Sequence, residues 1–272
     1  MHAALRAEVE KTTGAMQAVQ RLSGGDISDV YRVTAAQGEF VVKTHLRPPE
    51  GFFEAEALGL DLLKHQGLAV PQVVTVARSF LIMEYLSPGE PSLHAAGEAL
   101  AHLHAVKQPA FGLSQDTYLA TLLQNNRESS DWADFYWRQR LLPVLESLAE
   151  YAAREQELWH RFTSRTQALL RSCPFPALLH GDLWAGNLYY SGRGPVFIDP
   201  ACYAGDPLVD IAMTRLFGGF DAEFYAAYAA NSPRREEAER FIRIYQIYPL
   251  LVHAKLFGGA YYRRAAVIRD SY

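Results

Sequence analysis

The sequence predicts an α+β fold of two lobes, a small β-rich lobe followed by a larger helical one. Short β-rich runs bounded by Gly, Pro or Ser fill much of the chain up to residue 86. From Ala95 to Leu170, and again from Leu208 to Ile268, Ala, Leu, Tyr and Trp recur at the three-to-four spacing of helices. A polar turn at Ser87–Pro91 lies between the two compositions. We therefore expect lobes of residues 1–86 and 87–272, joined by a short hinge.

Within the first lobe, three β-rich segments and one helix are expected. The segments are SGGDISDVYRV (23–33), EFVVKTH (39–45) and SFLIMEYL (79–86), and the helix is FFEAEALGLDLLKHQG (52–67). The first 14 residues place charged and apolar residues at helical spacing and contain no signal-peptide core. A small β island, residues 178–201, separates the two helical blocks of the second lobe.

Bulk composition narrows the class of protein. The chain has 272 residues, 49% of them hydrophobic, and a net charge of −4, which gives no electrostatic reason to expect nucleic acid or an anionic membrane as a partner. The late apolar segment is interrupted by His253, Lys255 and glycines, so it predicts a core helix rather than a membrane span. Cys173 and Cys202 are too few for a disulfide framework. We expect buried thiols and a cytoplasmic location.

The β island, LLHGDLWAGNLYYSGRGPVFIDPA, combines buried strands with an unusual number of polar groups. Its second half predicts a hairpin, with the turn in SGRGP. If Leu188 pairs with Ile198, Asn187 falls opposite Asp199 at the open end of the hairpin. A carboxylate and an amide oxygen are hard ligands of the kind that Mg²⁺ prefers.

Asp182 lies five residues before Asn187, in the loop that enters this hairpin. An Asp, an Asn five residues later and a second Asp after a hairpin is the layout of kinase machinery. There the first Asp accepts the hydroxyl proton, and the Asn and second Asp hold metal on the phosphates. Asp182 and Asn187 could equally serve only to bind loop amides. A metal-dependent hydrolase built on His180 and Asp182 is disfavoured, because no further His cluster accompanies them.

Lys43 is expected to face a cleft. In EFVVK, Val41 and Lys43 share one face of the strand. In the helix that follows, Glu56 lies in the middle of an apolar arc, and a carboxylate buried there needs a cation. Lys43 is the candidate, giving the strand-lysine and helix-glutamate pair that positions nucleotide phosphates in kinases. The alternative is that Glu56 lies at a frayed, solvated edge.

Two backbone segments complete the expected nucleotide site. The N–H groups of a glycine-rich loop at Gly24–Ser28 could cover phosphates, although an ordinary hairpin turn explains the same residues equally well. The backbone of Glu84–Leu86, at the end of the first lobe, is where an adenine edge would find hydrogen bonds in a two-lobed kinase. A plain buried strand is the alternative there.

With these pieces assembled, the sequence resembles the fructosamine kinase (ketosamine kinase) family, a branch of the aminoglycoside phosphotransferase-like, protein-kinase-like fold. The matching segments include LLHGDLWAGN, IDPACYAGD, LFGGF, EFVVK, FFEAEALGL and QNNRESSDWADFYWRQRL, in order over nearly the whole chain. HGDLW followed by IDPA and LFGGF is specific to this family. One departure is YAGDPLVD at residues 203–210, whose GDPLxD wording is typical of the broader aminoglycoside- and choline-kinase-like group.

The resemblance implies a role for each of these positions. Asp182 would be the catalytic base, and Asn187 and Asp199 would bind Mg²⁺. The indole of Trp184 would stack on the sugar part of the substrate, with a core tryptophan as the alternative. Asp210 would brace the catalytic loop. The residues expected to bind ATP are Gly24, Gly25, Asp26, Ile27, Ser28, Val41, Lys43, Glu56, Met83, Glu84, Tyr85 and Leu86.

The leading hypothesis is thus an ATP- and Mg²⁺-dependent kinase that phosphorylates a sugar hydroxyl of a ketosamine, the Amadori adduct of a sugar and an amine. The resemblance leaves open which sugar and which amine. The alternatives are a kinase of another amino- or hydroxyl-bearing metabolite and a nucleotide-binding pseudokinase. The presence of Lys43, Glu56, Asp182, Asn187 and Asp199 argues against a pseudokinase.

Overall fold

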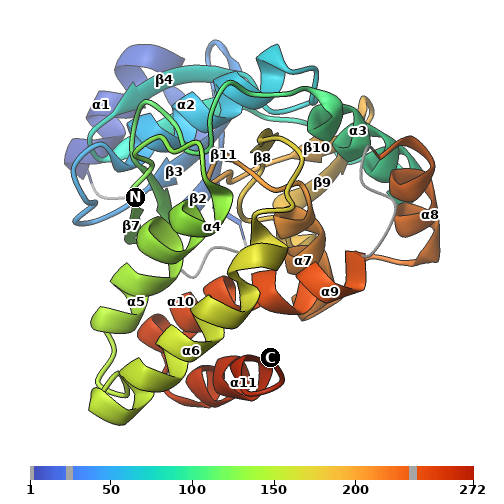
Figure 1. The fold of residues 1–272 in the computed structure, drawn as a ribbon. Coiled ribbons are helices and arrows are strands. Elements are labelled where there is room, and N and C mark those ends of the chain that lie inside the picture. The colour runs from blue at the N-terminus through green and yellow to red at the C-terminus, as the bar shows by residue number, and fades with distance from the viewer. Residues whose placement is uncertain (1–2, 23–26, 233–237) are drawn as a thin grey trace.

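The computed structural model describes residues 3–22, 27–232 and 238–272. Its N-terminal part is an antiparallel sheet with strand order β1-β2-β3-β5-β4, accompanied by two helices (Figure 1). Strands β1 and β4, the two edges, are additional to the predicted segments, and most of their side chains are exposed or only partly buried, so their apolar pattern is weak. The elements are α1 (Ala3–Thr13), β1 (Met16–Arg21), β2 (Asp29–Ala35), β3 (Gly38–Thr44), α2 (Phe52–His65), β4 (Val73–Ala77) and β5 (Phe80–Glu84).

The two faces of this sheet are covered by different helices. On one face, Phe40 and Val42 of β3 pack in a buried cluster with Leu5 and Val9 of α1. On the other face, α2 packs through Phe53 and its neighbours against β5. Val41 and Lys43 therefore face α2, as the strand alternation predicts.

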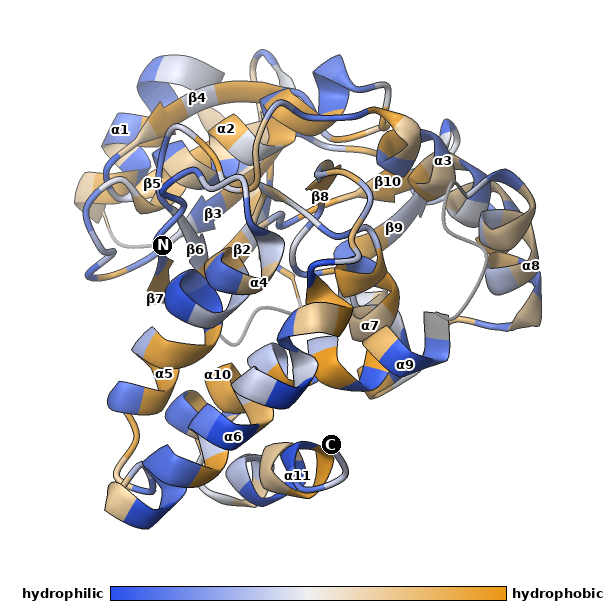
Figure 2. Cartoon of the chain, viewed as in Figure 1, coloured by the Kyte–Doolittle hydropathy of each residue, from blue (hydrophilic) through white to orange (hydrophobic). Residues whose placement is uncertain are grey.

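The C-terminal part is mainly helical and holds the largest buried cluster. Figure 2 shows α10 as largely hydrophobic and α6 as largely hydrophilic, in keeping with the deeper burial of α10. The helical segments are α3 (Leu93–Ala105), α4 (Trp132–Phe135), a π-helical turn (Tyr136–Leu141), α5 (Leu142–Glu146), α6 (Ala153–Leu170), a 3₁₀ turn (Ala185–Asn187), α7 (Leu208–Phe217), α8 (Ala222–Asn231), α9 (Ala238–Tyr245), α10 (Ile247–Phe257) and α11 (Ala260–Arg269).

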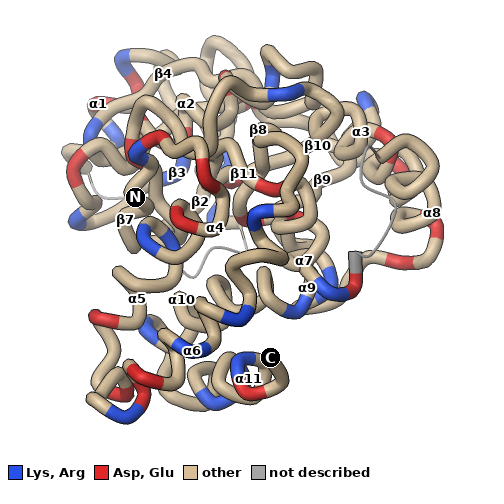
Figure 3. Tube along the Cα trace, in the orientation of Figure 1, with Lys and Arg blue, Asp and Glu red and all other residues tan. Residues whose placement is uncertain are grey.

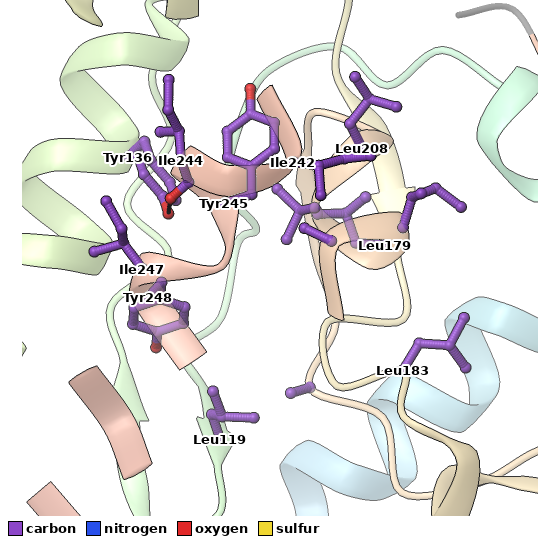
Figure 4. Close-up of a cluster of buried hydrophobic side chains, with 14 of the residues drawn as sticks. Leu119, Tyr136, Leu179, Leu183, Leu208, Ile242, Ile244, Tyr245, Ile247 and Tyr248 are labelled. Atoms are coloured by element: carbon purple, nitrogen blue, oxygen red, sulfur yellow. Dashed lines mark hydrogen bonds between the residues drawn. The ribbon is translucent and has the colours of Figure 1, made fainter. Parts of the chain in front are cut away.

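Three two-stranded pairs are set among these helices. They are β6 (Thr117–Leu119) with β7 (Leu122–Gln124), β8 (Ala177–Leu179) with β11 (Tyr203–Gly205), and β9 (Leu188–Ser191) with β10 (Gly194–Phe197). The β6–β7 hairpin interrupts the stretch expected to be helical. Figure 4 shows how the large core joins these parts: Leu179, in the β island, lies near Leu208 of α7 and Ile242 of α9.

The predicted register of the β9–β10 hairpin is wrong by one residue. Leu188 pairs with Phe197, not Ile198, because Ser191 pairs with Gly194 and only Gly192 and Arg193 lie between them. Asn187 therefore faces Ile198, whose N–H donates to the Asn187 carbonyl at 3.0 Å. Asp199 lies one residue beyond the predicted position.

Charged residues of both signs are interspersed over both parts of the molecule (Figure 3). Within residues 3–22, 27–232 and 238–272, no helix is long and apolar enough to cross a bilayer.

Candidate active site

The loop after β8 carries Asp182 and is fixed by a buried carboxylate. Asp210, in the first turn of α7, accepts the backbone N–H of His180 at 2.8 Å and that of Gly181 at 2.9 Å. His104 of α3 contacts the same carboxylate through Nε2 at 3.1 Å. Burial alone opposes ionisation of Asp210, but the His104 contact and these amides hold its pKa below the usual range. Asp210 thus braces the loop as the resemblance implies.

The same loop packs directly on the segment that follows β10. Gly181 has φ +84°, and a Cβ there would lie 2.0 Å from the Ala201 carbonyl oxygen, so only glycine fits. The Ala201 N–H donates to the His180 carbonyl at 2.8 Å. The two segments that carry Asp182 and Asp199 are therefore held together by their backbones.

Both ring nitrogens of His180 make structural contacts. Its Nε2 contacts the Ile198 carbonyl at 3.0 Å, and its Nδ1 accepts the N–H of Asp182 at 3.3 Å. Burial lowers its pKa, so the ring is neutral. With both ring nitrogens in use, His180 is a poor metal ligand, which argues against a hydrolase.

Asp182 and Asn187 contact each other directly, across the 3₁₀ turn between them. The Asn187 amide donates to the Asp182 carbonyl at 2.8 Å and to its carboxylate Oδ2 at 3.1 Å. Burial, together with the negative charge of nearby Asp199, raises the pKa of Asp182 to about 8. Oδ1 of Asp182 has no partner among the described residues, so it is the carboxyl oxygen left open to a substrate hydroxyl.

Lys43 joins the sheet, α2 and the segment after β10. Its Nζ lies 2.7 and 2.8 Å from the two carboxylate oxygens of Glu56 and 2.8 Å from Oδ1 of Asp199. Burial lowers the pKa of Lys43, but the two carboxylates outweigh it and raise the pKa above its ordinary value. The predicted pair is present, and Asp199 is a second partner that the sequence did not indicate.

Asn187 and Asp199 fit a magnesium ion by their chemistry. Within the part of the chain that the structure describes, Oδ1 of Asn187 and Oδ2 of Asp199 have no hydrogen-bond partner. Their segments adjoin through the bond from Ile198 to Asn187. An amide oxygen and a carboxylate oxygen are the hard donors that Mg²⁺ prefers.

The predicted adenine segment, residues 84–86, is attached to the β9–β10 hairpin. The Glu84 carboxylate forms a two-bond ion pair with Arg193, at 2.9 and 3.0 Å. The Leu86 carbonyl accepts the hydroxyl of Tyr189 at 2.9 Å. The amides of Glu84 and Tyr85 already donate to backbone carbonyls, so Leu86 is the one of the three whose N–H has no partner among the described residues.

The other expected nucleotide residues are distributed as follows. Val41 and Met83 are paired neighbours on β3 and β5, on the face of the sheet that also carries Lys43. Ile27 is partly buried beside them and Ser28 is buried. Gly24, Gly25 and Asp26 lie outside the described residues, so the expected phosphate loop stays a prediction.

Trp184 is at the surface rather than in the core. Its side chain is 43% exposed, and the ring covers Gly186 so closely that a Cβ there would lie 2.2 Å from it. The indole therefore lies against the turn that follows Asp182 and is partly open to solvent.

The sequence did not indicate His104 or Arg193. Both act on partners about 100 positions away in the chain, and neither stands in a local pattern that marks its role.

Comparison with known proteins decides the family. The sequence profile described as "Fructosamine kinase" matches residues 1–271. The chain belongs to the fructosamine kinase family. It is 40% identical over 240 residues to a "Probable ketoamine kinase" of Thermus thermophilus, covering 88% of each chain. A second "Probable ketoamine kinase", from Enterococcus faecium, is 37% identical over 247 residues, which is 88% of this chain and 89% of that one.

Solved structures agree in fold. A crystal structure of a Thermobifida fusca protein assigned as a fructosamine-3-kinase has a TM-score of 0.88 at 33% identity, covering 98% of each chain. The complex of APH(2″)-IIa with streptomycin and ATP has a TM-score of 0.67 at 18% identity, covering 100% of this chain and 97% of that one. The predicted two-lobed, protein-kinase-like fold is confirmed.

The Lys43–Glu56 pair yields a quantitative prediction. Lys43→Ala leaves Glu56 buried without its cation, and Glu56→Ala leaves Lys43 with Asp199 alone. Each should therefore lower kcat/KM and the free energy of unfolding, while the double variant should lose less than the sum. We expect a coupling of about 1–3 kcal/mol in urea unfolding. The exposed pair of positions Glu54 and Lys64, on the same helix, serves as a control that should be additive. Additive losses for Lys43→Ala and Glu56→Ala would contradict the pairing.

Proposed function

We propose that this chain transfers the γ-phosphoryl group of ATP to a sugar hydroxyl of a ketosamine, with Asp182 as the catalytic base. The observation that carries the proposal is the connected set of contacts Asn187–Asp182 and Glu56–Lys43–Asp199, in a chain of the fructosamine kinase family. This set contains a proton acceptor, two oxygen ligands and a fixed cation, the parts that phosphoryl transfer requires.

In this proposal ATP lies between the sheet and the helical part, with the lobes meeting at residues 86 and 87. Adenine would accept a hydrogen bond from the N–H of Leu86, which has no partner among the described residues, and Val41 and Met83 would pack against its ring. Lys43 would contact the phosphates. Ile27 and Ser28 lead from the predicted phosphate loop into β2. The solved APH(2″)-IIa complex, which contains ATP, supports the use of ATP by this fold.

Asn187 and Asp199 are the residues proposed to hold Mg²⁺, which would neutralise charge on the phosphates when bound. Asn187 also has a role that does not need the metal, because its amide orients the Asp182 carboxylate. That leaves Oδ1 of Asp182 directed to accept the proton of the attacking hydroxyl. Lys43, held protonated by two carboxylates, supplies a positive charge that does not depend on pH in the physiological range.

The acidic residues of the helical part favour a ketosamine over a polycationic aminoglycoside. A polycationic aminoglycoside would need a broad acidic surface. The candidates for it are scattered: Asp206, Asp210, Asp221 and Glu223. Asp206 and Asp210 are fully buried, and Asp221 caps α8 through the amides of Glu223 and Phe224. These residues therefore offer no broad acidic surface, whereas the exposed indole of Trp184 suits the apolar face of a sugar.

A substrate panel tests the proposal. The purified chain is incubated with ATP and Mg²⁺ and a fructosamine, a ribulosamine, an aminoglycoside or choline, and the phosphorylated product is followed by ³¹P NMR. We expect phosphorylation of the ketosamines and little of the other two. Asp182→Asn should bind ATP normally but turn over about 10²–10⁴-fold more slowly, the usual contribution of a positioned base. Efficient aminoglycoside phosphorylation without ketosamine turnover would overturn the substrate assignment, and normal turnover by folded Asp182→Asn would remove Asp182 from the mechanism.

Trp184 provides a separate prediction about specificity. If its indole stacks on the sugar, and contacts a protonated amine through its π face, Trp184→Ala should raise the KM for ketosamine by about tenfold while the KM for ATP changes little. Trp137→Ala is the control, because that half-buried tryptophan packs edge-on against His160 of α6 instead. An unchanged ketosamine KM in Trp184→Ala would contradict the stacking role and leave the activity assignment intact.

A further inference from the structure

Gly59 occupies the middle of α2, on its buried face, where a glycine weakens a helix. Its position is explained by what it touches. A Cβ on Gly59 would lie 2.9 Å from Cγ of Pro200 and 3.4 Å from Sγ of Cys202, closer to the proline than real contacts allow. The glycine therefore lets α2 lie directly against the segment that follows Asp199.

Helix α2 is attached to the helical part of the molecule along its whole length. Near its first turn, the Tyr118 hydroxyl of β6 donates to the Glu50 carbonyl at 2.7 Å, and the ring packs edge-on against Phe52. In its middle, the Cys202 thiol donates to the Gly59 carbonyl at 3.6 Å. Near its end, Leu63 belongs to the large core of the C-terminal part. Helix α2 is thus fixed on both lobes.

Gly59 is also linked to the charged groups of the site. Glu56 and Gly59 are three residues apart and therefore share a helix face. Glu56 pairs with Lys43, Lys43 pairs with Asp199, and Asp199 is followed by the proline that packs on Gly59. These contacts form a closed ring. Asp199 itself has φ +56°, the left-handed region that is uncommon for a non-glycine residue, although Asp tolerates it better than most.

We propose that Gly59 is a positioning residue for the phosphoryl-transfer site. By seating Pro200 against α2, it fixes the backbone that carries Asp199 while Lys43 fixes the carboxylate. Gly59 touches no substrate and acts only through Asp199. The proposal rests on the function proposed above, in which Asp199 is a metal ligand.

The test uses the 272-residue chain with Cys173→Ser, so that Cys202 is its only thiol. The variants are Gly59→Ala, Gly59→Ala with Pro200→Ala, and Glu54→Ala as an exposed control on the same helix. Three quantities are measured: the rate at which Cys202 reacts with a thiol reagent, the affinity for Mn²⁺ in the presence of ADP, and kcat with ketosamine.

Gly59→Ala should speed the reaction of Cys202, weaken Mn²⁺ binding and lower kcat by about 10–100-fold, the scale expected when a reacting group is displaced by less than about 1 Å. The KM for ketosamine should change little. Adding Pro200→Ala removes the atom that the new methyl group meets. It should return the Cys202 reaction rate, the Mn²⁺ affinity and kcat most of the way to the parent values, and Glu54→Ala should match the parent.

Normal Mn²⁺ affinity and Cys202 reactivity in folded Gly59→Ala would overturn the proposal, as would a double variant no better than the single one. If Gly59→Ala does not fold, the double variant decides: recovery of folded, metal-binding protein supports the contact, and failure to recover contradicts it. If the parent does not phosphorylate ketosamines, the proposed function fails, whereas thiol reactivity and Mn²⁺ binding still report on Gly59.

Discussion

The charge of Lys43 is the constraint on which the site depends. An ammonium group out of water is costly unless opposite charges surround it at hydrogen-bond distance. Lys43 is 7% exposed and meets this requirement with carboxylates from two other segments, Glu56 of α2 and Asp199 after β10. One buried cation therefore joins the sheet, the helix above it and the helical part, and it does so at the point where phosphates are expected.

A second buried charge holds the loop of Asp182 and does not involve Lys43. Asp210 accepts the backbone N–H groups of His180 and Gly181 and is itself contacted by His104. The segments that Lys43 and Asp210 hold are joined by backbone hydrogen bonds. The Ala201 N–H donates to the His180 carbonyl, and the Ile198 N–H donates to the Asn187 carbonyl. The proposed base and the proposed metal ligands thus lie on two segments that are held by buried charges and share one interface, which is the preorganisation that phosphoryl transfer needs.

Much of this site could be predicted from the sequence because its signals are local. Strand alternation placed Lys43 on the α2 face, and helical periodicity placed Glu56 on an apolar arc, so their pairing followed. The spacing of Asp182, Asn187 and Asp199 indicated one site. The hairpin register failed by one residue because SGRGP is compatible with a two-residue or a three-residue turn, and its residues do not decide between them.

Features that involve residues distant in the sequence could not be predicted. Nothing near Arg193 indicates that it binds Glu84, and nothing near Gly59 indicates a proline 141 positions later. The β6–β7 hairpin was missed because its strands have three residues each, too short for a period to be visible.

The Lys43 charge holds three segments in place at once, and hydrogen exchange followed by mass spectrometry tests this role most directly. The comparison is between the parent chain, Lys43→Met and the exposed control Lys64→Met. Loss of the cation leaves Glu56 buried without its partner, so exchange should accelerate in β3, in α2 and in residues 198–202 together, while the amides of His180 and Gly181, bound by Asp210, stay protected. Acceleration confined to β3, or no difference between Lys43→Met and Lys64→Met, would contradict the claim.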